Sequence, residues 1–149
     1  MSGYLSVARH PIILSLLDYW ESKRRGRPFP GRRDIDPGDF VYALGNILLV
    51  DVLAGPRYRY RLFGTNAAFR HGFDLTGCVL QDMPQTEYRD FAIAQYDAVR
   101  KARKPLFPVG SRTLGNRLWH YEAALLPLAA DGANIDMILV YLGFIEPPA

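Results

Sequence analysis

Few residues of this chain are of types that could do chemistry, and their spacing matches no common catalytic motif. The sequence contains no GxSxG, no Gly-rich Lys-Ser/Thr phosphate loop and no HExxH. With three histidines and one cysteine, we expect no multidentate metal site. His120 and Glu122 share one side of a predicted strand and could form an acid–base pair. We favour the alternative, in which they form the polar outward side of that strand, and we expect no enzyme activity.

Aromatic residues on predicted strands are candidates for a ligand-binding cavity, because their rings could stack on a planar molecule. They fit an ordinary core equally well. Arg61 could clamp a ligand carboxylate with two parallel hydrogen bonds. Its alternation with Arg57 and Arg59 instead favours a solvated or dimer-facing sheet surface, and the sequence leaves both interpretations open. The residues that we predict to bind a ligand are Tyr60, Arg61, Thr65, His71, Trp119, Tyr121 and Tyr141.

Composition limits the class of protein. The chain has 149 residues, of which 49% are apolar and 13% aromatic, and this predicts one folded domain. Charged residues interrupt every apolar segment, so no membrane span is expected. A single cysteine, Cys78, fits a reducing compartment, and we expect a cytoplasmic protein. The net charge of +3 comes largely from basic residues where helices should end, so nucleic acid is not an expected partner.

The elements that must position these residues follow from periodicity. A helix is predicted from Pro11 to Arg25, and its apolar stripe consists of Ile12, Ile13, Leu16, Leu17 and Trp20. After a Pro-rich loop, Asp36 caps a short predicted helix that ends near Leu44. A buried strand is then expected over Ile47–Leu53.

The next predicted strand alternates, with Arg57, Arg59 and Arg61 on one side and Tyr58, Tyr60 and Leu62 on the other. Thr65 is predicted to cap a helix over 66–71, and Gly72 to end it.

Thr86 begins a longer predicted helix to about Ala102, with one side formed by Tyr88, Phe91, Ala92, Gln95 and Val99. Three strands complete the α+β pattern: 106–114, 117–126 and 135–145. Gly115-Asn116 and Asp131-Gly132 supply the two turns between these strands.

This element order, and short motifs along the chain, resemble the PAS domain, and more narrowly the short single-domain PAS-like proteins of proteobacteria. The motifs are Leu17-x-x-Trp20, Asp34-Ile35-Asp36-Pro37, Leu48-Leu49-Val50-Asp51-Val52, Tyr60-Arg61-Leu62-x-Gly64-Thr65, Gly72-x-Asp74-Leu75-Thr76-Gly77 and Leu126-Pro127-Leu128. The resemblance implies a five-stranded antiparallel sheet in the order 2-1-5-4-3, with helices packed on one face. Residues 34–149 would form the PAS-like domain, preceded by an N-terminal helix and a basic loop over 1–33.

The resemblance also implies a sensory or regulatory module that binds a small organic ligand or a partner protein, with output through a separate effector. Two alternatives remain: a small α+β enzyme acting on a hydrophobic substrate in the same cavity, and a structural dimerisation module with a filled core.

No cofactor is expected. In light-sensing PAS domains, the flavin-reactive cysteine lies in Asn-Cys-Arg-Phe-Leu-Gln, whereas Cys78 directly follows Gly77 and lacks the flanking Asn and Arg. We therefore interpret Cys78 as a buried structural thiol. His71 lies where some PAS domains hold haem iron, but a lone histidine at a helix end is more often a charge complement. Neither flavin nor haem is predicted.

The apolar stripe of the leading helix could pack on its own sheet or on a second subunit, and we expect it to exceed what one small sheet can cover. An uncovered stripe of this size would be a large exposed patch, so we predict a homodimer through Ile12, Ile13, Leu16, Leu17 and Trp20.

Overall fold

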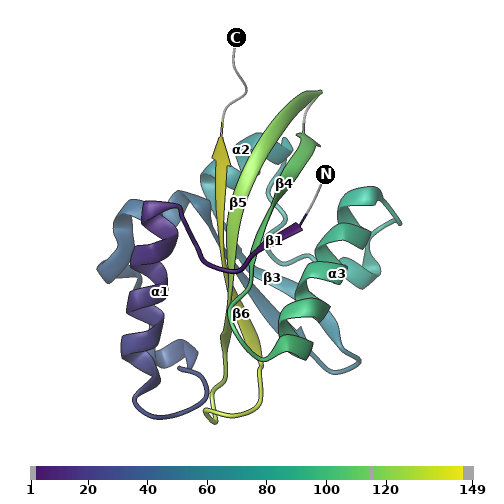
Figure 1. Cartoon of the computed structure of the whole chain (residues 1–149). Helices are drawn as coiled ribbons and strands as arrows, with labels where there is room; N and C mark the ends of the chain where they lie inside the picture. The colour runs from purple at the N-terminus through teal and green to yellow at the C-terminus, as the bar shows by residue number, and fades with distance from the viewer. Residues whose placement is uncertain (1–2, 115, 146–149) are drawn as a thin grey trace.

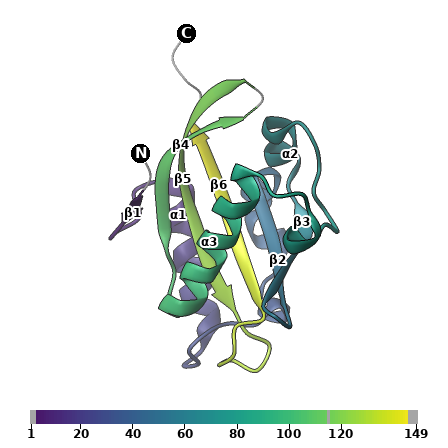
Figure 2. The same ribbon diagram turned by 90° about the vertical axis from the view of Figure 1, so that its right-hand side faces the viewer.

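One antiparallel sheet stands between two layers of helices in the computed structural model, which describes residues 3–114 and 116–145 (Figures 1 and 2). The helices are α1 (Pro11–Arg24), α2 (Thr65–His71) and α3 (Glu87–Ala102), with the short 3-10 helices η1 (Arg32–Asp34), η2 (Pro37–Asn46) and η3 (Leu80–Asp82). The strands are β1 (Gly3–Leu5), β2 (Ile47–Leu53), β3 (Arg57–Phe63), β4 (Phe107–Leu114), β5 (Arg117–Leu128) and β6 (Met137–Ile145). None of the helices in these residues is long and apolar enough to cross a membrane.

The strands lie in the order β1-β4-β5-β6-β2-β3, and every neighbouring pair is antiparallel. Leaving β1 aside, this is the predicted order 2-1-5-4-3. The extra strand β1 pairs with the outer side of β4, and three residues are too short to give a readable period. Of the predicted turn Gly115-Asn116, Gly115 lies outside the described residues, and Asn116 has a φ of +66°.

The sheet buries both of its faces, as Figure 1 shows with α1 on one side and α3 on the other. Successive residues of β2 point to opposite faces, so Ile47 and Leu49 pack toward α1 while Leu48 and Val50 pack toward α2 and α3. This explains why β2 is a continuous apolar run in the sequence. The expectation of helices on one face holds for α2 and α3, but η2 lies with α1 on the other.

The apolar stripe of α1 is covered by its own sheet. Ile13, Leu16 and Trp20 are buried, and Ile12 and Leu17 are half-buried against the same core. The indole Nε1 of Trp20 donates a hydrogen bond to the Pro127 carbonyl of β5 over 2.8 Å. The expectation that this stripe is left uncovered for a second subunit is therefore wrong. The homodimer itself stays a prediction, as does the division of the chain after residue 33.

The turn into α2 differs from the prediction at Thr65. The N-cap is Gly64, and no side chain caps the helix; Thr65 is its first residue. The φ of Gly64 is −58°, so this glycine is not required for a left-handed conformation. It is required for space, because a Cβ there would lie 2.4 Å from the Gly45 carbonyl oxygen. The predicted stop at Gly72 is confirmed, with a φ of +91°.

Strand β3 also departs from simple alternation. A β-bulge shifts the register between β2 and β3, so Val50 pairs with Tyr60 and Leu49 with Leu62. Arg61 is the extra residue on the bulged strand, and Leu62 consequently does not share the face of Tyr58 and Tyr60 as predicted.

Candidate ligand-binding pocket

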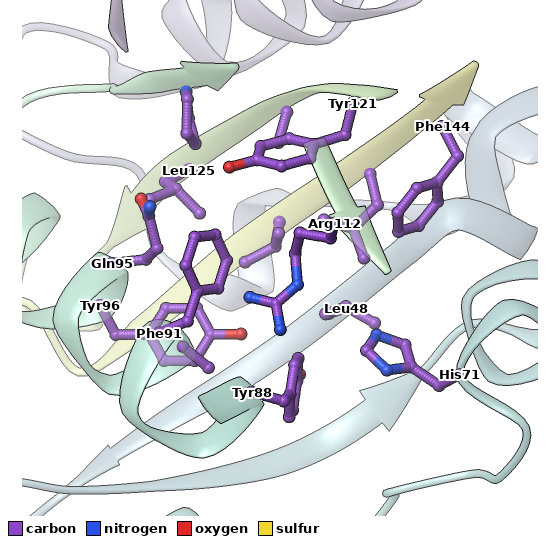
Figure 3. A pocket seen from close by; sticks show the side chains of 15 residues that line it. Leu48, His71, Tyr88, Phe91, Gln95, Tyr96, Arg112, Tyr121, Leu125 and Phe144 are labelled. Carbon is purple, nitrogen blue, oxygen red and sulfur yellow. The ribbon is translucent and has the colours of Figure 1, made fainter. Parts of the chain in front are cut away.

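The candidate site is an apolar cavity of about 50 Å³ between α3 and the face of the sheet that α3 covers. The side chains that surround it are drawn in Figure 3. The residues that line it are Leu48, His71, Tyr88, Phe91, Ala92, Gln95, Tyr96, Pro108, Arg112, Tyr121, Ala123, Leu125, Val140, Leu142 and Phe144.

Helix α3 forms the roof of this pocket. The Thr86 hydroxyl accepts a hydrogen bond from the Arg89 amide over 3.1 Å, and this cap fixes where the helix begins. The predicted helical side is confirmed: Tyr88, Phe91 and Gln95 recur at helical spacing and line the pocket. The floor consists of alternate residues of the central strands, including Tyr121, Ala123 and Leu125 of β5.

Arg112 of β4 is the charged residue among those that line the cavity. Its guanidinium carbon lies 4.1 Å from the ring centroid of Phe91 and 5.3 Å from that of Tyr88. Figure 3 shows the side chain reaching across the pocket toward these rings. Its Nε is buried and has no hydrogen-bond partner, and no carboxylate of the described residues forms an ion pair with it.

Tyr121 contributes a second polar atom without a partner. Its residue is only 6% exposed, and no described group bonds its hydroxyl. The ring packs edge-on against Phe91, with 6.1 Å between centroids. A buried polar atom without a partner costs free energy, so a bound polar molecule would satisfy a need that the described residues leave open.

The hydroxyls of Tyr60 on β3 and of Tyr88 and Tyr96 on α3 form a buried cluster where these two elements meet. Tyr60 of β3 shares hydrogen bonds with Tyr88 and with Tyr96, the latter over 2.7 Å. Burial raises the pKa of Tyr88 to about 12 and the pKa of Tyr60 well above 10. These hydroxyls therefore stay protonated at neutral pH and bond mainly one another.

His71, at the end of α2, closes the pocket beside Tyr88, with 4.6 Å between ring centroids. Burial, with the nearby charge of Arg112 as a smaller cause, lowers the pKa of His71 to about 4. The imidazole is therefore neutral at pH 7, and Arg112 is the positive group that remains among the lining residues.

The predicted ligand-binding residues divide into two groups. His71 and Tyr121 line the pocket, and Tyr60 lies one hydrogen bond behind it. Tyr141 faces the α1 side, where its ring lies 5.7 Å from that of His10. Thr65 is exposed at the start of α2.

Trp119 is buried next to Phe144, with 6.2 Å between ring centroids, and is not among the lining residues.

Arg61 lies on the other face of the sheet, so it does not reach the pocket. Its Nε donates to Oδ1 of Asp51 over 3.0 Å, and Arg59 binds Oδ2 of the same carboxylate over 2.9 Å. Asp51 is buried, whereas the Arg61 side chain is 55% exposed. Of the two interpretations, the solvated sheet surface describes the position of Arg61.

His120 and Glu122 lie away from the pocket, as the outward interpretation predicted. His120 is exposed, and its Nδ1 shares a hydrogen bond of 2.6 Å with the Ser111 hydroxyl. The Glu122 carboxylate accepts hydrogen bonds from the backbone amides of Arg9 and His10 over 2.9 and 2.8 Å. Glu122 thus holds the segment between β1 and α1 against the sheet.

Sequence reasoning missed Arg112. On β4 it shares a side with Pro108 and Gly110, while Val109 and Ser111 alternate with them, so neither side of the strand reads as apolar. The one available signal was that Tyr121 of β5 was predicted to face inward. Gly110 of β4 pairs with Tyr121, and Arg112, two residues further along β4, therefore lies on the same face as Tyr121.

No group of three or more metal-ligating side chains occurs within residues 3–114 and 116–145. Cys78 is half-buried and is not among the residues that line the pocket. The cavity of about 50 Å³ is far smaller than the roughly 300–1,000 Å³ typical of cofactor pockets. A flavin does not fit the pocket with its side chains in these positions. The absence of a cofactor stays a prediction.

Comparison with known proteins identifies the fold family. A family model described as a PAS domain matches residues 8–143. Among solved structures, the LOV protein of Rhodobacter sphaeroides has a TM-score of 0.48 and 15% identity, covering 74% of this chain and 69% of that one. An RNA-binding light-oxygen-voltage receptor has a TM-score of 0.51 and 15% identity, and the match covers 95% of this chain but 38% of the receptor. A search of curated proteins found none that matches.

The family match extends over most of the chain, so the chain belongs to the PAS domain family. The likeness to the RNA-binding light-oxygen-voltage receptor, at 15% identity, concerns the fold alone.

Proposed function

We propose that this chain is a PAS sensory module that binds a small organic ligand between α3 and the sheet and passes its state to a separate effector protein. The observation that carries the proposal is an apolar cavity into which two polar groups without partners project, Arg112 and Tyr121. Ligand sites typically combine apolar walls with a few such polar groups. A core that served only to stabilise the fold would gain from filling the cavity and pairing both groups.

Ligand binding in this pocket would change the contacts of the N-terminal segment, and this segment could transmit the bound state to an effector protein. Tyr4 of β1 donates a hydrogen bond to Gln95 of α3 over 3.1 Å, and Gln95 lines the cavity. Glu122, on the other face of the floor strand β5, holds the backbone of Arg9 and His10. A ligand that shifts α3 against β5 would therefore change the packing of β1 and of the segment that leads into α1.

The enzyme alternative has less support. The described residues that line the pocket include no carboxylate, and no acidic or basic side chain among them hydrogen-bonds His71. His120 and Glu122 lie on the opposite face of β5 from Tyr121. We therefore propose binding without catalysis.

Native mass spectrometry of the purified chain tests the ligand proposal. We expect a bound small molecule on the unaltered protein, and its loss from Ala123→Leu, which places extra side-chain atoms on the pocket floor. Ala102→Leu is the matched control, because Ala102 is exposed at the end of α3. The proposal would be contradicted if the unaltered protein carried no added mass, or if Ala123→Leu retained the same mass.

A further inference from the structure

The charge of Arg112 has no counter-charge among the described residues around it. Its guanidinium contacts the faces of Phe91 and Tyr88, and its buried Nε bonds nothing. Asp51, on the other face of the sheet, differs in this respect, because its buried carboxylate forms ion pairs with two arginines. Arg112 is half-buried, with its Nε shielded from solvent, and a charge that loses part of its hydration gains from an ionic partner.

The aromatic contacts do not replace an anion. A cation over a ring is attracted by the quadrupole of the ring, which carries no net charge. His71 carries no charge at pH 7, so it does not add a second positive charge to the pocket. The pocket therefore combines a single positive charge with apolar walls, and a partner with one negative charge would balance it.

Arg112 is also reachable from outside. Arg112 and Tyr88 line both the inner cavity and a groove between the start of α3 and the β4–β5 hairpin. They thus form the wall between the two spaces. Glu87 is the carboxylate among the residues that line the groove, and the ion pairs of the described residues do not join it to Arg112. A small anion that entered through the groove would meet the guanidinium first.

We propose that the pocket binds a short-chain monocarboxylate, whose anionic end binds Arg112 and whose apolar end lies against Ala123, Leu125 and Val140. This inference rests on the proposed function and names the chemical class of its ligand. A planar carboxylate matches the fork of one guanidinium with two parallel hydrogen bonds. The apolar floor favours a hydrocarbon tail over inorganic phosphate, which would leave most of its oxygens without donors.

The size of the cavity favours a short tail. A cavity needs roughly 10–15 Å³ to hold one water molecule, so about 50 Å³ has room for only a few water-sized groups. A longer acid would require Phe91 or Arg112 to move.

Isothermal titration with a matched set of probes tests this inference on the full chain. The set is propionate, butyrate, butyramide, 1-butanol and inorganic phosphate, in a buffer without carboxylates. We expect propionate and butyrate to bind at least about tenfold more tightly than butyramide, which has nearly the same shape but no charge. Phosphate and butanol are expected to bind as weakly as butyramide.

Two variants assign the effect to Arg112. Arg112→Gln is expected to weaken butyrate binding at least about tenfold and to abolish the preference over butyramide. Lys101→Gln removes the same formal charge from an exposed position at the end of α3, so it should leave both unchanged. The comparison of the acid with its amide on the unaltered chain requires no variant, so the test survives if Arg112→Gln fails to fold.

The outcomes separate the ligand class from the function. Equal binding of butyrate and butyramide, stronger binding of phosphate, or unchanged butyrate binding by a folded Arg112→Gln would each overturn the carboxylate inference. If no probe binds, the inference is overturned as well. A different molecule seen by native mass spectrometry would then leave the proposed sensory function intact, whereas an empty pocket there would end both.

Discussion

Charged and titratable residues in this chain differ in function according to what they pair with. Arg61 and Arg59 satisfy the buried Asp51, so their charges belong to the fold. Arg112 has no such partner and faces a cavity. The three residues are the same type on two distant strands of one sheet, β3 and β4, and their partners distinguish a structural arginine from a candidate ligand-binding one.

His71 gives a prediction at this scale. The charged or titratable groups against it are Arg112 from β4 and Tyr88 from α3. Its pKa is about 4 in the folded chain, below the ordinary 6.5, so the unfolded chain takes up the proton first as pH falls. Stability should therefore decline between pH 6.5 and about 4, by at most about 3–4 kcal/mol. Urea unfolding at a series of pH values measures this slope.

His71→Gln should flatten the slope in that range, and a ring-proton titration should place the His71 pKa near 4. The pKa values of Asp34 and Asp131 are lowered below their ordinary 3.8, so protonation of these carboxylates reduces stability mainly at a lower pH than protonation of His71 does. An unchanged slope in His71→Gln would mean that His71 is not held neutral by its surroundings.

At the scale of elements, two threonines stand at helix starts but only one caps. The Thr86 hydroxyl accepts the Arg89 amide at the start of α3, whereas Thr65 is exposed and caps nothing in α2. Thr86→Ala should therefore lose about 0.5–2 kcal/mol of stability. Thr65→Ala should change stability by less than about 0.5 kcal/mol. Thermal or urea unfolding of the two matched variants provides the measurement, and equal losses would contradict the assigned helix starts.

The bulge in β3 is the other decisive feature of an element. By inserting Arg61 it moves Leu62 off the face of Tyr58 and Tyr60, and Phe63 returns to that face in the core. The strand thus keeps Tyr60 within reach of Tyr88 and Tyr96 while Arg61 stays with Asp51. One extra residue thus determines which side chains of β3 enter the core on that face.

At the scale of the whole molecule, α1 completes the core on the second face of the sheet. Leu16 of α1 is buried there, while Leu14 of the same helix is 40% exposed. Leu16→Ala should lose about 2–5 kcal/mol of unfolding free energy, as expected for a truncated core residue. Leu14→Ala should lose much less.

The same experiment examines the predicted dimer. Because α1 packs on its own sheet, the loss in Leu16→Ala should not depend on protein concentration. An unfolding midpoint that rises with concentration, together with similar losses for both variants, would instead place α1 in an interface between subunits.

The sequence by itself determined most of the helices and strands and the α+β class, because apolar period and turn residues are local properties. The strand order was implied only by the resemblance to PAS domains, and the sheet has that order once β1 is set aside. It also determined that Tyr88, Phe91 and Gln95 share one side of a helix, since helical spacing alone requires it. The PAS resemblance, carried by short motifs in order, agrees with the family match.

Only the tertiary structure decided which residues meet. The pocket joins Arg112 of β4, Phe91 of α3 and His71 of α2, and no local pattern links these positions. The bulge moved Leu62 off the face of Tyr58 and Tyr60, and the register of β4 against β5 brought Arg112 into the pocket. An arginine is paired only if folding brings a carboxylate within reach of it, and that carboxylate can lie far away in the sequence. The pairing therefore follows from the tertiary packing and not from any local pattern.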